Sequence, residues 1–337
     1  MDRITIIGSG SIGLSMGLGI KAIGLNETEL VGTSGNRQWR EKATETGAFD
    51  SVGGHLGDAL VGARLVILDT PAVETRELME AIGPILEQDC RVTNTALSML
   101  QSLEWAEAYF REDTTFVAGR PLVRAPSADL DAADGGMFQG ADYCLAPSVT
   151  ARPDAVKTVV GLVEALGAVP LFLDSHEHDS YSAAVTLMPS LLSSALMSMA
   201  SESPSWREMS KLVANEFDQM SKLASVDPVE LSTEIEANAE SVAVWIGRLI
   251  EKLETYRRLT QSPREQVEEA LIRGWEERSK LELGAIVEDD GPRMPSTGES
   301  VASMFVGSRL AGRARDIKDA GKNDPWRYSG KKTKTDR

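Results

Sequence analysis

Cysteine, histidine and aromatic residues are scarce in this chain of 337 residues. It contains two cysteines, three histidines and 5% aromatic residues. The two cysteines, Cys90 and Cys144, cannot form a disulfide framework and lack the paired spacing of a zinc knuckle. We therefore expect free thiols, no metal site and a reducing, cytoplasmic compartment. The first residues lead directly into an apolar strand, without the basic segment and cleavage site of a signal peptide.

Positive charge is also in short supply. The chain has 35 Lys and Arg against 51 Asp and Glu, a net charge of −16. Such an acidic chain is a poor binder of nucleic acids and anionic membranes, which are themselves polyanions. The longest apolar stretch, Ala183–Met199, contains Pro189 and several Ser and Thr residues. It predicts a buried helix rather than a membrane span.

The first half of the chain alternates short apolar runs with amphipathic segments of helix length, such as 73–86 and 155–166. Strands that alternate with helices predict a mostly parallel, doubly wound sheet of the Rossmann type, with α/β architecture and right-handed crossovers. The expected strands are Ile4–Ile7, Glu29–Gly32, Leu65–Leu68, Arg91–Thr93, Thr115–Ala118, Asp142–Ala146 and Pro170–Leu173.

After about residue 174 the pattern becomes all-helical, with helices expected over 179–201, 204–224, 228–259 and 264–283. We therefore expect a nucleotide-binding domain over 1–173 and a helical substrate and dimerisation domain over 174–284. The apolar stripe within 237–258 is interpreted as facing the core, and it could also form a dimer surface. Residues 285–337, rich in Gly, Pro, Ser and charge, predict a mostly disordered tail.

A glycine-rich turn joins the first expected strand to a helix. The pattern Gly-Ser-Gly-Ser-Ile-Gly follows the apolar residues 4–7 and opens a helical segment. In a dinucleotide-binding unit the first glycine permits the tight turn, the second the close approach of the pyrophosphate, and the third close packing of helix on strand. The residues expected to bind the cofactor here are Gly8, Ser9, Gly10, Ser11, Ile12 and Gly13.

The choice of cofactor is predicted from the end of the second strand. NAD enzymes usually carry Asp or Glu there, which bonds the ribose hydroxyls. This chain has Thr33, Ser34 and Arg37, with Arg40 one turn further on, and no carboxylate that would repel a 2′-phosphate. The sequence therefore favours NADP over NAD.

Together with several later segments, the glycine-rich turn resembles the prephenate/arogenate dehydrogenase family of tyrosine biosynthesis. The resemblance extends over about residues 4 to 259. The segments that carry the resemblance are Gly8–Ser15, Val66–Pro71, Val117–Pro121, Ala133–Gly140, Ala165–Ala168, Asp174–Asp179, Ala183–Leu196 and Phe217–Ala224. The resemblance implies a Rossmann domain followed by a helical dimerisation domain, a homodimer, and a small carboxylated substrate. The reaction it implies is oxidative decarboxylation with transfer of a hydride to nicotinamide. It also implies cofactor contacts from Thr70, Pro71 and Asn94.

The chain departs from the family where proton transfer is expected. Arg120 stands at the position of the family's catalytic His, and a guanidinium cannot act as a base. Ser98 takes the place of the family's serine only with a shift of one residue. Thr186 opens the helix that carries further His residues in the family, and Lys222 replaces its carboxylate-binding Arg. The residues expected to act in catalysis are therefore Arg120, Ser98, Thr186 and Lys222.

Two other functions remain open from the sequence. Lys211 and Asn215 are four residues apart on an expected helix, so they would share a face and could serve a β-hydroxyacid-type dehydrogenase. The missing histidines also allow a protein without catalytic activity that binds NADP as a sensor or partner subunit. His178 is interpreted as a helix-entry or hinge residue rather than a catalytic one.

Overall fold

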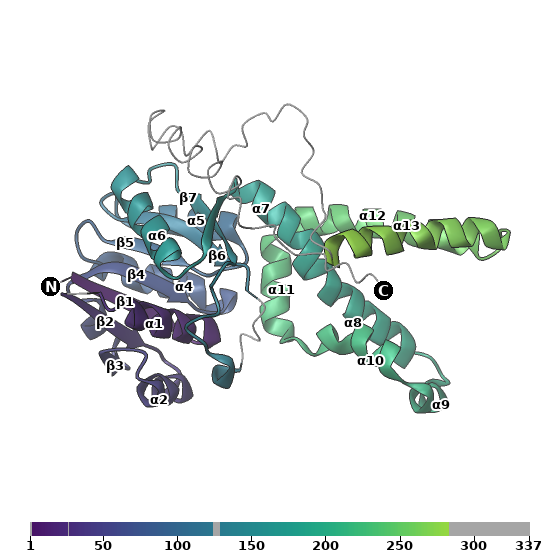
Figure 1. Cartoon of the computed structure of the whole chain (residues 1–337), viewed down its shortest axis with the longest axis horizontal. Coiled ribbons are helices and arrows are strands. Elements are labelled where there is room, and N and C mark those ends of the chain that lie inside the picture. Colours follow the sequence, from purple (N-terminus) through teal and green to yellow (C-terminus); the bar gives the residue numbers. More distant parts are fainter. Residues whose placement is uncertain (1, 26, 124–128, 283–337) are drawn as a thin grey trace, which may run out of the picture. The chain divides into compact units, whose positions relative to one another are not determined.

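The computed structural model describes residues 2–25, 27–123 and 129–282. Its centre is an eight-stranded sheet of order β3-β2-β1-β4-β5-β6-β7-β8 (Figure 1). Neighbouring strands are parallel except for the antiparallel pair β6 and β7. The strands are β1 (Asp2–Gly8), β2 (Thr28–Thr33), β3 (Ser51–Gly53), β4 (Ala63–Asp69), β5 (Arg91–Asn94), β6 (Thr115–Pro121), β7 (Asp142–Pro147) and β8 (Val169–Phe172). The expected Rossmann-type sheet is confirmed.

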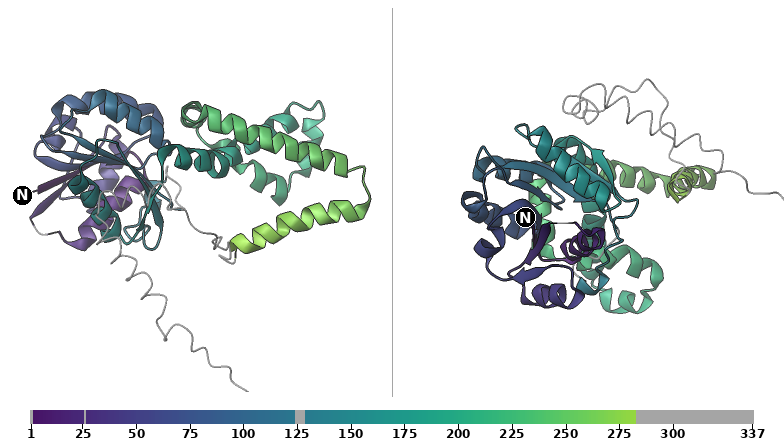
Figure 2. Two further views of the ribbon diagram at one scale, coloured as in Figure 1. Left: turned by 90° about the horizontal axis from the view of Figure 1, so that it is seen from above. Right: turned by 60° about the vertical axis from the view of Figure 1, so that its left-hand side comes forward.

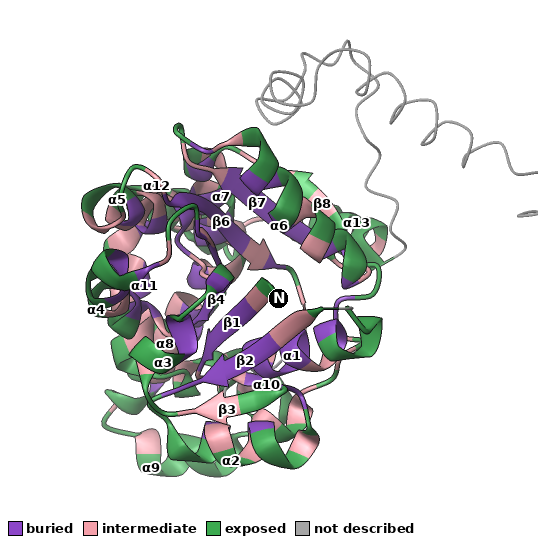
Figure 3. Cartoon of the chain, turned by 90° about the vertical axis from the view of Figure 1, so that its left-hand side faces the viewer, coloured by how far each residue is buried: buried purple, intermediate pink, exposed green. Residues whose placement is uncertain are grey.

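Helices cover both faces of this sheet, and the strands from β2 to β7 in the sheet order are mostly buried, whereas the edge strands β3 and β8 are partly exposed (Figure 3). Adjacent residues of β1 show the two faces, because Ile6 packs into one apolar cluster and Ile7 into the other. Burial on both faces is why these strands are continuous apolar runs rather than alternating ones. The helices are α1 (Ser11–Ile23), α2 (Arg37–Thr46), α3 (Leu56–Leu60), α4 (Ala72–Ile82), α5 (Met99–Tyr109) and α6 (Pro153–Ala165).

The strand order reverses between β1 and β4. From β1 the chain runs outward through β2 to β3, whereas β4 starts the other half of the sheet. The loops that leave the carboxyl ends of these two strands therefore diverge and leave a crevice, which is where doubly wound proteins bind nucleotides. The glycine-rich turn after β1 lies at this edge of the sheet.

The chain after β8 contains only helices among its described residues, and Figure 2 shows them in green as a group separate from the sheet. Helices α7 and α11 of this group pack against α5 and α4 of the sheet domain. The helices are α7 (Ser175–Ser182), a π-helical turn (Ala183–Leu187), α8 (Met188–Ser201), α9 (Trp206–Met209), α10 (Asn215–Ser221), α11 (Pro228–Ala237), α12 (Ala239–Leu259) and α13 (Arg264–Glu282). The expected helical second domain is confirmed.

Two of the expected long helices are interrupted. Residues 204–224 form α9, α10 and two 3₁₀ turns, Ser210–Leu212 and Lys222–Ser225, instead of one helix. Residues 228–259 are divided at Asn238, whose side-chain amide donates to the carbonyl of Glu234. Side chains that bond the local backbone compete with helical hydrogen bonds, and periodicity does not reveal this competition.

The interpretation of the apolar stripe on α12 as core-facing was wrong for most of its length. Val242 is buried, but Ile246, Ile250 and Leu253 are 38%, 54% and 53% exposed. Within the part of the chain that the structure describes, these three apolar side chains are therefore not enclosed in a core. An exposed apolar face of this length is typical of an interface with another chain.

The helical segment Ser175–Ser201 is long and apolar enough to cross a membrane by length and composition. Only 28% of the tested window is buried inside the protein. The expectation of a buried helix was therefore wrong on one side, where Val185 and Met199 are exposed. The tail predicted for 285–337 lies outside the described residues.

Candidate active site

The turn between β1 and α1 is shaped by what lies directly beside its glycines. Gly10, the N-cap of α1, has an extended backbone and no side-chain cap. A Cβ on Gly8 would lie 2.5 Å from the Trp39 ring, and one on Gly13 would lie 2.7 Å from the Asp69 carboxylate. The close approach of Trp39 is therefore a further reason for glycine at position 8, beside the expected tight turn.

Asp69, at the carboxyl end of β4, closes the opposite side of this turn. Its Oδ2 accepts the Gly13 N–H at 2.7 Å, and its Oδ1 accepts the Thr95 hydroxyl at 2.7 Å. The side chain is buried, and burial raises the pKa of its carboxyl above the ordinary value while these hydrogen bonds act in the opposite direction. Asp69 thus links β4, the turn and the loop after β5, a role that the sequence analysis did not anticipate.

The residues expected to select NADP gather at the end of β2. Thr33 and Ser34 are buried there, and Ser34 Oγ accepts the Asn36 N–H at 3.0 Å. Arg40 donates to the Ser34 carbonyl at 2.6 Å, whereas the Arg37 side chain is 83% exposed and pairs with Glu41. The end of β2 thus carries hydroxyl, amide and guanidinium groups, together with the Glu41 carboxylate that pairs with Arg37.

The other expected cofactor contacts lie on the ends of β4 and β5. Pro71 is the N-cap of α4, and the Thr70 hydroxyl lies 3.0 Å from that of Thr75. The Asn94 amide is buried; it donates to Ser102 at 2.9 Å and accepts the Gly119 N–H at 2.9 Å. The Asn94 side chain therefore joins β5, β6 and α5, so its role is to position the ends of these strands.

A buried polar cluster joins the sheet domain to the helical domain. We call it the junction cluster, and its members are Ser98, Arg120, Asp179, Ser182, Thr186, Glu234 and Asn238. Ser98 donates its hydroxyl hydrogen to Glu234 Oε2 at 2.5 Å and accepts a hydrogen bond from Asn238 Nδ2 at 2.7 Å. All three side chains are more than 90% buried. Ser98 thus meets Glu234, which is 136 positions away in sequence, and Asn238, which is 140 positions away, at the carboxyl edge of the sheet.

Arg120 brings a positive charge into the junction cluster from the end of β6. Its guanidinium donates to Ser182 Oγ at 2.6 Å and to Thr186 Oγ1 at 3.1 Å. Burial lowers the pKa of Arg120, and the nearby Cys144, Glu234 and Asp179 raise it. Because a guanidinium keeps its proton at any physiological pH, Arg120 serves as a half-buried cation and hydrogen-bond donor.

Glu234 is the group in the junction cluster with the most perturbed acidity. Burial is the largest cause and raises its pKa from 4.5 to about 7. The Ser98 hydrogen bond and the charge of Arg120 lower the pKa, while Glu230 and Asp179 raise it. A carboxyl group that titrates near neutrality can exchange a proton at the pH at which enzymes work.

Asp179 ties the two domains together through the backbone. Its two oxygens accept the N–H groups of Met99 and Leu100 at 3.0 Å each, so a residue of α7 caps the N-terminus of α5. His178 beside it is buried, with Nδ1 2.8 Å from Asp179 and Nε2 3.5 Å from Ser182. His178 lies in the first turn of α7, as expected, and contacts Asp179 and Ser182 of the junction cluster.

Other residues singled out from the sequence lie elsewhere. Lys222 is exposed in the turn Lys222–Ser225, and among the described residues its ammonium has no hydrogen-bond or ion-pair partner. Lys211 and Asn215 belong to two different elements, because the chain leaves the helical conformation between them. The premise that they share one helix face was wrong, since the α9 to α10 segment is broken into short turns.

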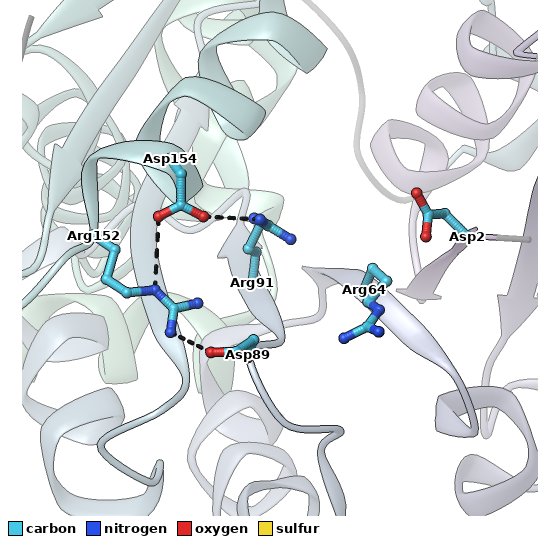
Figure 4. Close-up of a pocket in the computed structure, with 6 residues that line it drawn as sticks. All are labelled: Asp2, Arg64, Asp89, Arg91, Arg152 and Asp154. Atoms are coloured by element: carbon cyan, nitrogen blue, oxygen red, sulfur yellow. Dashed lines mark hydrogen bonds and ion pairs between the residues drawn. The ribbon is translucent and has the colours of Figure 1, made fainter.

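A cavity of about 430 Å³ lies at the opposite edge of the sheet (Figure 4). Its lining alternates in charge, with Arg152 bonded to Asp89 and Asp154, and Arg91 bonded to Asp154. The cavity adjoins the amino ends of β1, β4 and β5 rather than the carboxyl ends, where doubly wound sheets bind nucleotides.

Both cysteine thiols are buried, and burial raises the pKa of Cys90 to about 12 and of Cys144 to about 11. Neither thiol is therefore a reactive nucleophile at neutral pH.

Glu234 is not among the site residues expected from the sequence, although its position carries a signal. Leu231, Glu234, Asn238 and Val242 recur at helical spacing, which places two polar residues on the face that carries the apolar ones. A charged residue in such a stripe is buried only with a partner. The partner, Ser98, is far away in sequence, so the pattern alone could not identify it.

The nucleotide-binding fold, the glycine-rich turn before α1 and the polar cluster at the strand ends define a nicotinamide-dependent dehydrogenase. Residues 16–171 match the nucleotide-binding domain of prephenate dehydrogenase, and residues 174–276 match its dimerization domain. The chain therefore belongs to the prephenate dehydrogenase family, a family of oxidoreductases.

Relatives of known sequence and structure agree with this assignment. The chain is 26% identical to the prephenate dehydrogenase of Lactococcus lactis over 84% of this chain and 78% of that one. It is 23% identical to that of Bacillus subtilis over 76% and 70% of the two chains. Prephenate dehydrogenase from Aquifex aeolicus, solved with hydroxyphenyl propionate and NAD+, superposes with a TM-score of 0.76 at 20% identity, covering 83% of this chain and 98% of that one. Synechocystis arogenate dehydrogenase has a TM-score of 0.69 at 22% identity, covering 83% and 99%.

Proposed function

We propose that this protein catalyses the NADP-dependent oxidative decarboxylation of prephenate or arogenate. The observation that carries the proposal is the junction cluster, which places a half-buried cation, a hydroxyl group and a titratable carboxyl at the strand ends of a nucleotide-binding sheet. Members of the family named for these two substrates have the same fold. A substrate with carboxylate groups needs a cation where it is desolvated, and Arg120 supplies one.

The cofactor site is assigned to the crevice between β1 and β4. We propose that the pyrophosphate binds at the N-terminus of α1, beside Gly8 to Gly13, and that Thr33, Ser34 and Arg37 bind the 2′-phosphate. When bound, the cofactor supplies the acceptor of a hydride. The chain's own residues bind and orient the two reactants: Arg120 is assigned to a substrate carboxylate, and Ser98 and Thr186 to the neighbourhood of the reacting carbon.

The test is to follow NADPH formation by absorbance with prephenate and with arogenate, each with NADP+ and NAD+. We expect turnover with one of the two substrates and a higher kcat/KM with NADP+. Release of carbon dioxide and an aromatic product in equal amounts would identify the decarboxylation. Tight binding of NADPH without turnover of either substrate would overturn the proposal in favour of a protein that binds the cofactor without catalysis.

We further propose that the protein is a homodimer joined through its helical domain. The match to a dimerization domain and the exposed apolar residues Ile250 and Leu253 of α12 support this assembly. Sedimentation velocity should give the mass of a dimer. Ile250→Glu combined with Leu253→Glu should yield monomers, because two charges cannot be buried unpaired in an interface. Lys252→Glu, on an exposed position between them, is the matched control.

A further inference from the structure

The proposed reaction needs a group that accepts the proton of the substrate hydroxyl, and Arg120 at the end of β6 cannot accept one. We propose that Ser98 and Glu234 form a proton relay, in which Ser98 contacts the substrate hydroxyl and Glu234 takes up the proton through it. This inference rests on the proposed function and assigns its proton acceptor. Ser98 would be the catalytic residue, and Glu234 acts through it.

The hydrogen bonds around Ser98 define the direction of the relay. The Ser98 hydroxyl hydrogen points to Glu234 Oε2 at 2.5 Å, and one lone pair of its oxygen accepts from Asn238 Nδ2 at 2.7 Å. A hydroxyl oxygen has a second lone pair, which remains to accept a hydrogen from a substrate hydroxyl. Asn238 is itself held by the carbonyl of Glu234, one turn earlier in the chain. Donor and acceptor sides of Ser98 are therefore both set before a substrate arrives.

The charges around Glu234 come from every element packed on it. Arg120 from β6 is positive, Asp179 from α7 and Glu230 from α11 are negative, and Ser98 comes from the loop after β5. Burial outweighs the cation and brings the pKa of Glu234 to about 7. The carboxylate is therefore ionised for a large part of the time at neutral pH and is basic enough to hold a proton, as an efficient general base requires.

The proton moves out and back during one turnover. As the hydride leaves the ring carbon that bears the hydroxyl, the hydroxyl proton passes to Ser98 Oγ and the Ser98 proton passes to Glu234 Oε2. The substrate oxygen becomes a carbonyl. The bond to the ring carboxylate then breaks, carbon dioxide leaves, and the bonding electron pair aromatises the ring and returns negative charge to that oxygen. The oxygen takes back a proton from Ser98, Ser98 from Glu234, and no proton is released overall.

Glu234→Gln is the primary test, because glutamine keeps a hydrogen-bond acceptor for Ser98 and nearly the same shape but cannot take up a proton. We expect kcat to fall by ~10²- to 10⁴-fold, the usual contribution of a positioned base. Wild-type kcat should rise with pH through about 7, where Glu234 ionises. This ascending limb of the pH profile of kcat should be lost in the variant. Glu236→Gln makes the same substitution two residues further along α11, at an exposed position, and should leave kcat and the limb unchanged.

Two further variants separate the relay from a structural role. Ser98→Ala should lower kcat to a similar extent, because the path to Glu234 is interrupted. Glu234→Asp keeps a titratable carboxyl, but its side chain is one methylene shorter, so the carboxyl lies farther from Ser98. This variant should retain the rise of kcat with pH and have an intermediate kcat. NADPH binding and thermal unfolding establish that each variant is folded, and the Asp variant remains informative if the Gln variant does not fold.

The outcomes distinguish the relay from the proposed function. Wild-type turnover together with a Glu234→Gln variant that keeps kcat within about threefold and the limb near pH 7 overturns the relay alone. Absence of wild-type turnover with both substrates overturns the proposed function and the relay with it. Wild-type turnover with a large loss of kcat and of the limb in Glu234→Gln, but not in Glu236→Gln, supports both.

Discussion

The carboxylate of Asp69 accepts the backbone N–H of Gly13 at 2.7 Å, so an acidic side chain from β4 is bonded to the first turn of the nucleotide-binding helix. Asp69→Ala would leave this buried N–H and the Thr95 hydroxyl without their partner. We expect the free energy of unfolding to fall by about 1–3 kcal/mol, the cost of an unsatisfied buried group. Asp69→Asn keeps an acceptor and should lose less. Urea denaturation of both variants measures the difference, and equal losses would contradict this role.

Arg120 should set the pH at which the enzyme becomes active. Its charge lowers the pKa of Glu234, so Arg120→Met should raise that pKa and move the ascending limb of kcat above pH 7. Arg120→Lys keeps the charge but loses the two-pronged hydrogen bonding to Ser182 and Thr186. The Lys variant should therefore keep the limb in place while KM rises on the order of tenfold. A limb that stays at the same pH in the Met variant would show that Arg120 does not act on Glu234.

The stability of the protein should depend on pH through Glu234. Its pKa is about 7 in the folded protein against 4.5 ordinarily, so between these values the folded state binds the proton more tightly. Stability from this group is therefore present below pH 4.5 and is lost as pH rises through 7, a change on the order of 3 kcal/mol.

Glu234→Gln has no such carboxyl, so the measurement is its free energy of unfolding relative to wild type at pH 5 and pH 8. The variant should gain relative stability at pH 8, where wild type must keep a charge buried. Glu236→Gln should follow wild type at both values. A constant difference between Glu234→Gln and wild type at the two pH values would refute the raised pKa.

Arg37 is expected to discriminate between the two cofactors. Arg37→Ala should raise the Kd for NADP+ about tenfold, the loss of one hydrogen bond to a charged group, with little effect on NAD+. Gln38→Ala, the next exposed residue of α2, is the control and should change neither value. Isothermal titration calorimetry of wild type and both variants with NADP+ and NAD+ measures the six constants. A similar loss for both cofactors would place Arg37 outside the 2′-phosphate site.

Local pattern determined the part of the fold that depends on neighbours in sequence. The apolar run before Gly8, the glycines themselves and the helical spacing after them were sufficient to predict β1, α1 and the doubly wound sheet. Where side chains bond their own backbone, as Asn238 does, the same periodicity predicted one helix and the structure has two. Periodicity reports which face is apolar, and it does not report what covers that face, as the exposed Ile250 on α12 demonstrates.

The sequence by itself determined the nucleotide-binding unit, the all-helical second half and the absence of a base at Arg120, because each depends on residue type and short-range spacing. Only the tertiary structure decided that Glu234 meets Ser98, and that Asp179 caps α5 across the domain junction. These contacts join residues 80 to 136 positions apart, and no local pattern encodes such a distance. Burial, which changes the pKa of Glu234, exists only once both domains are packed together.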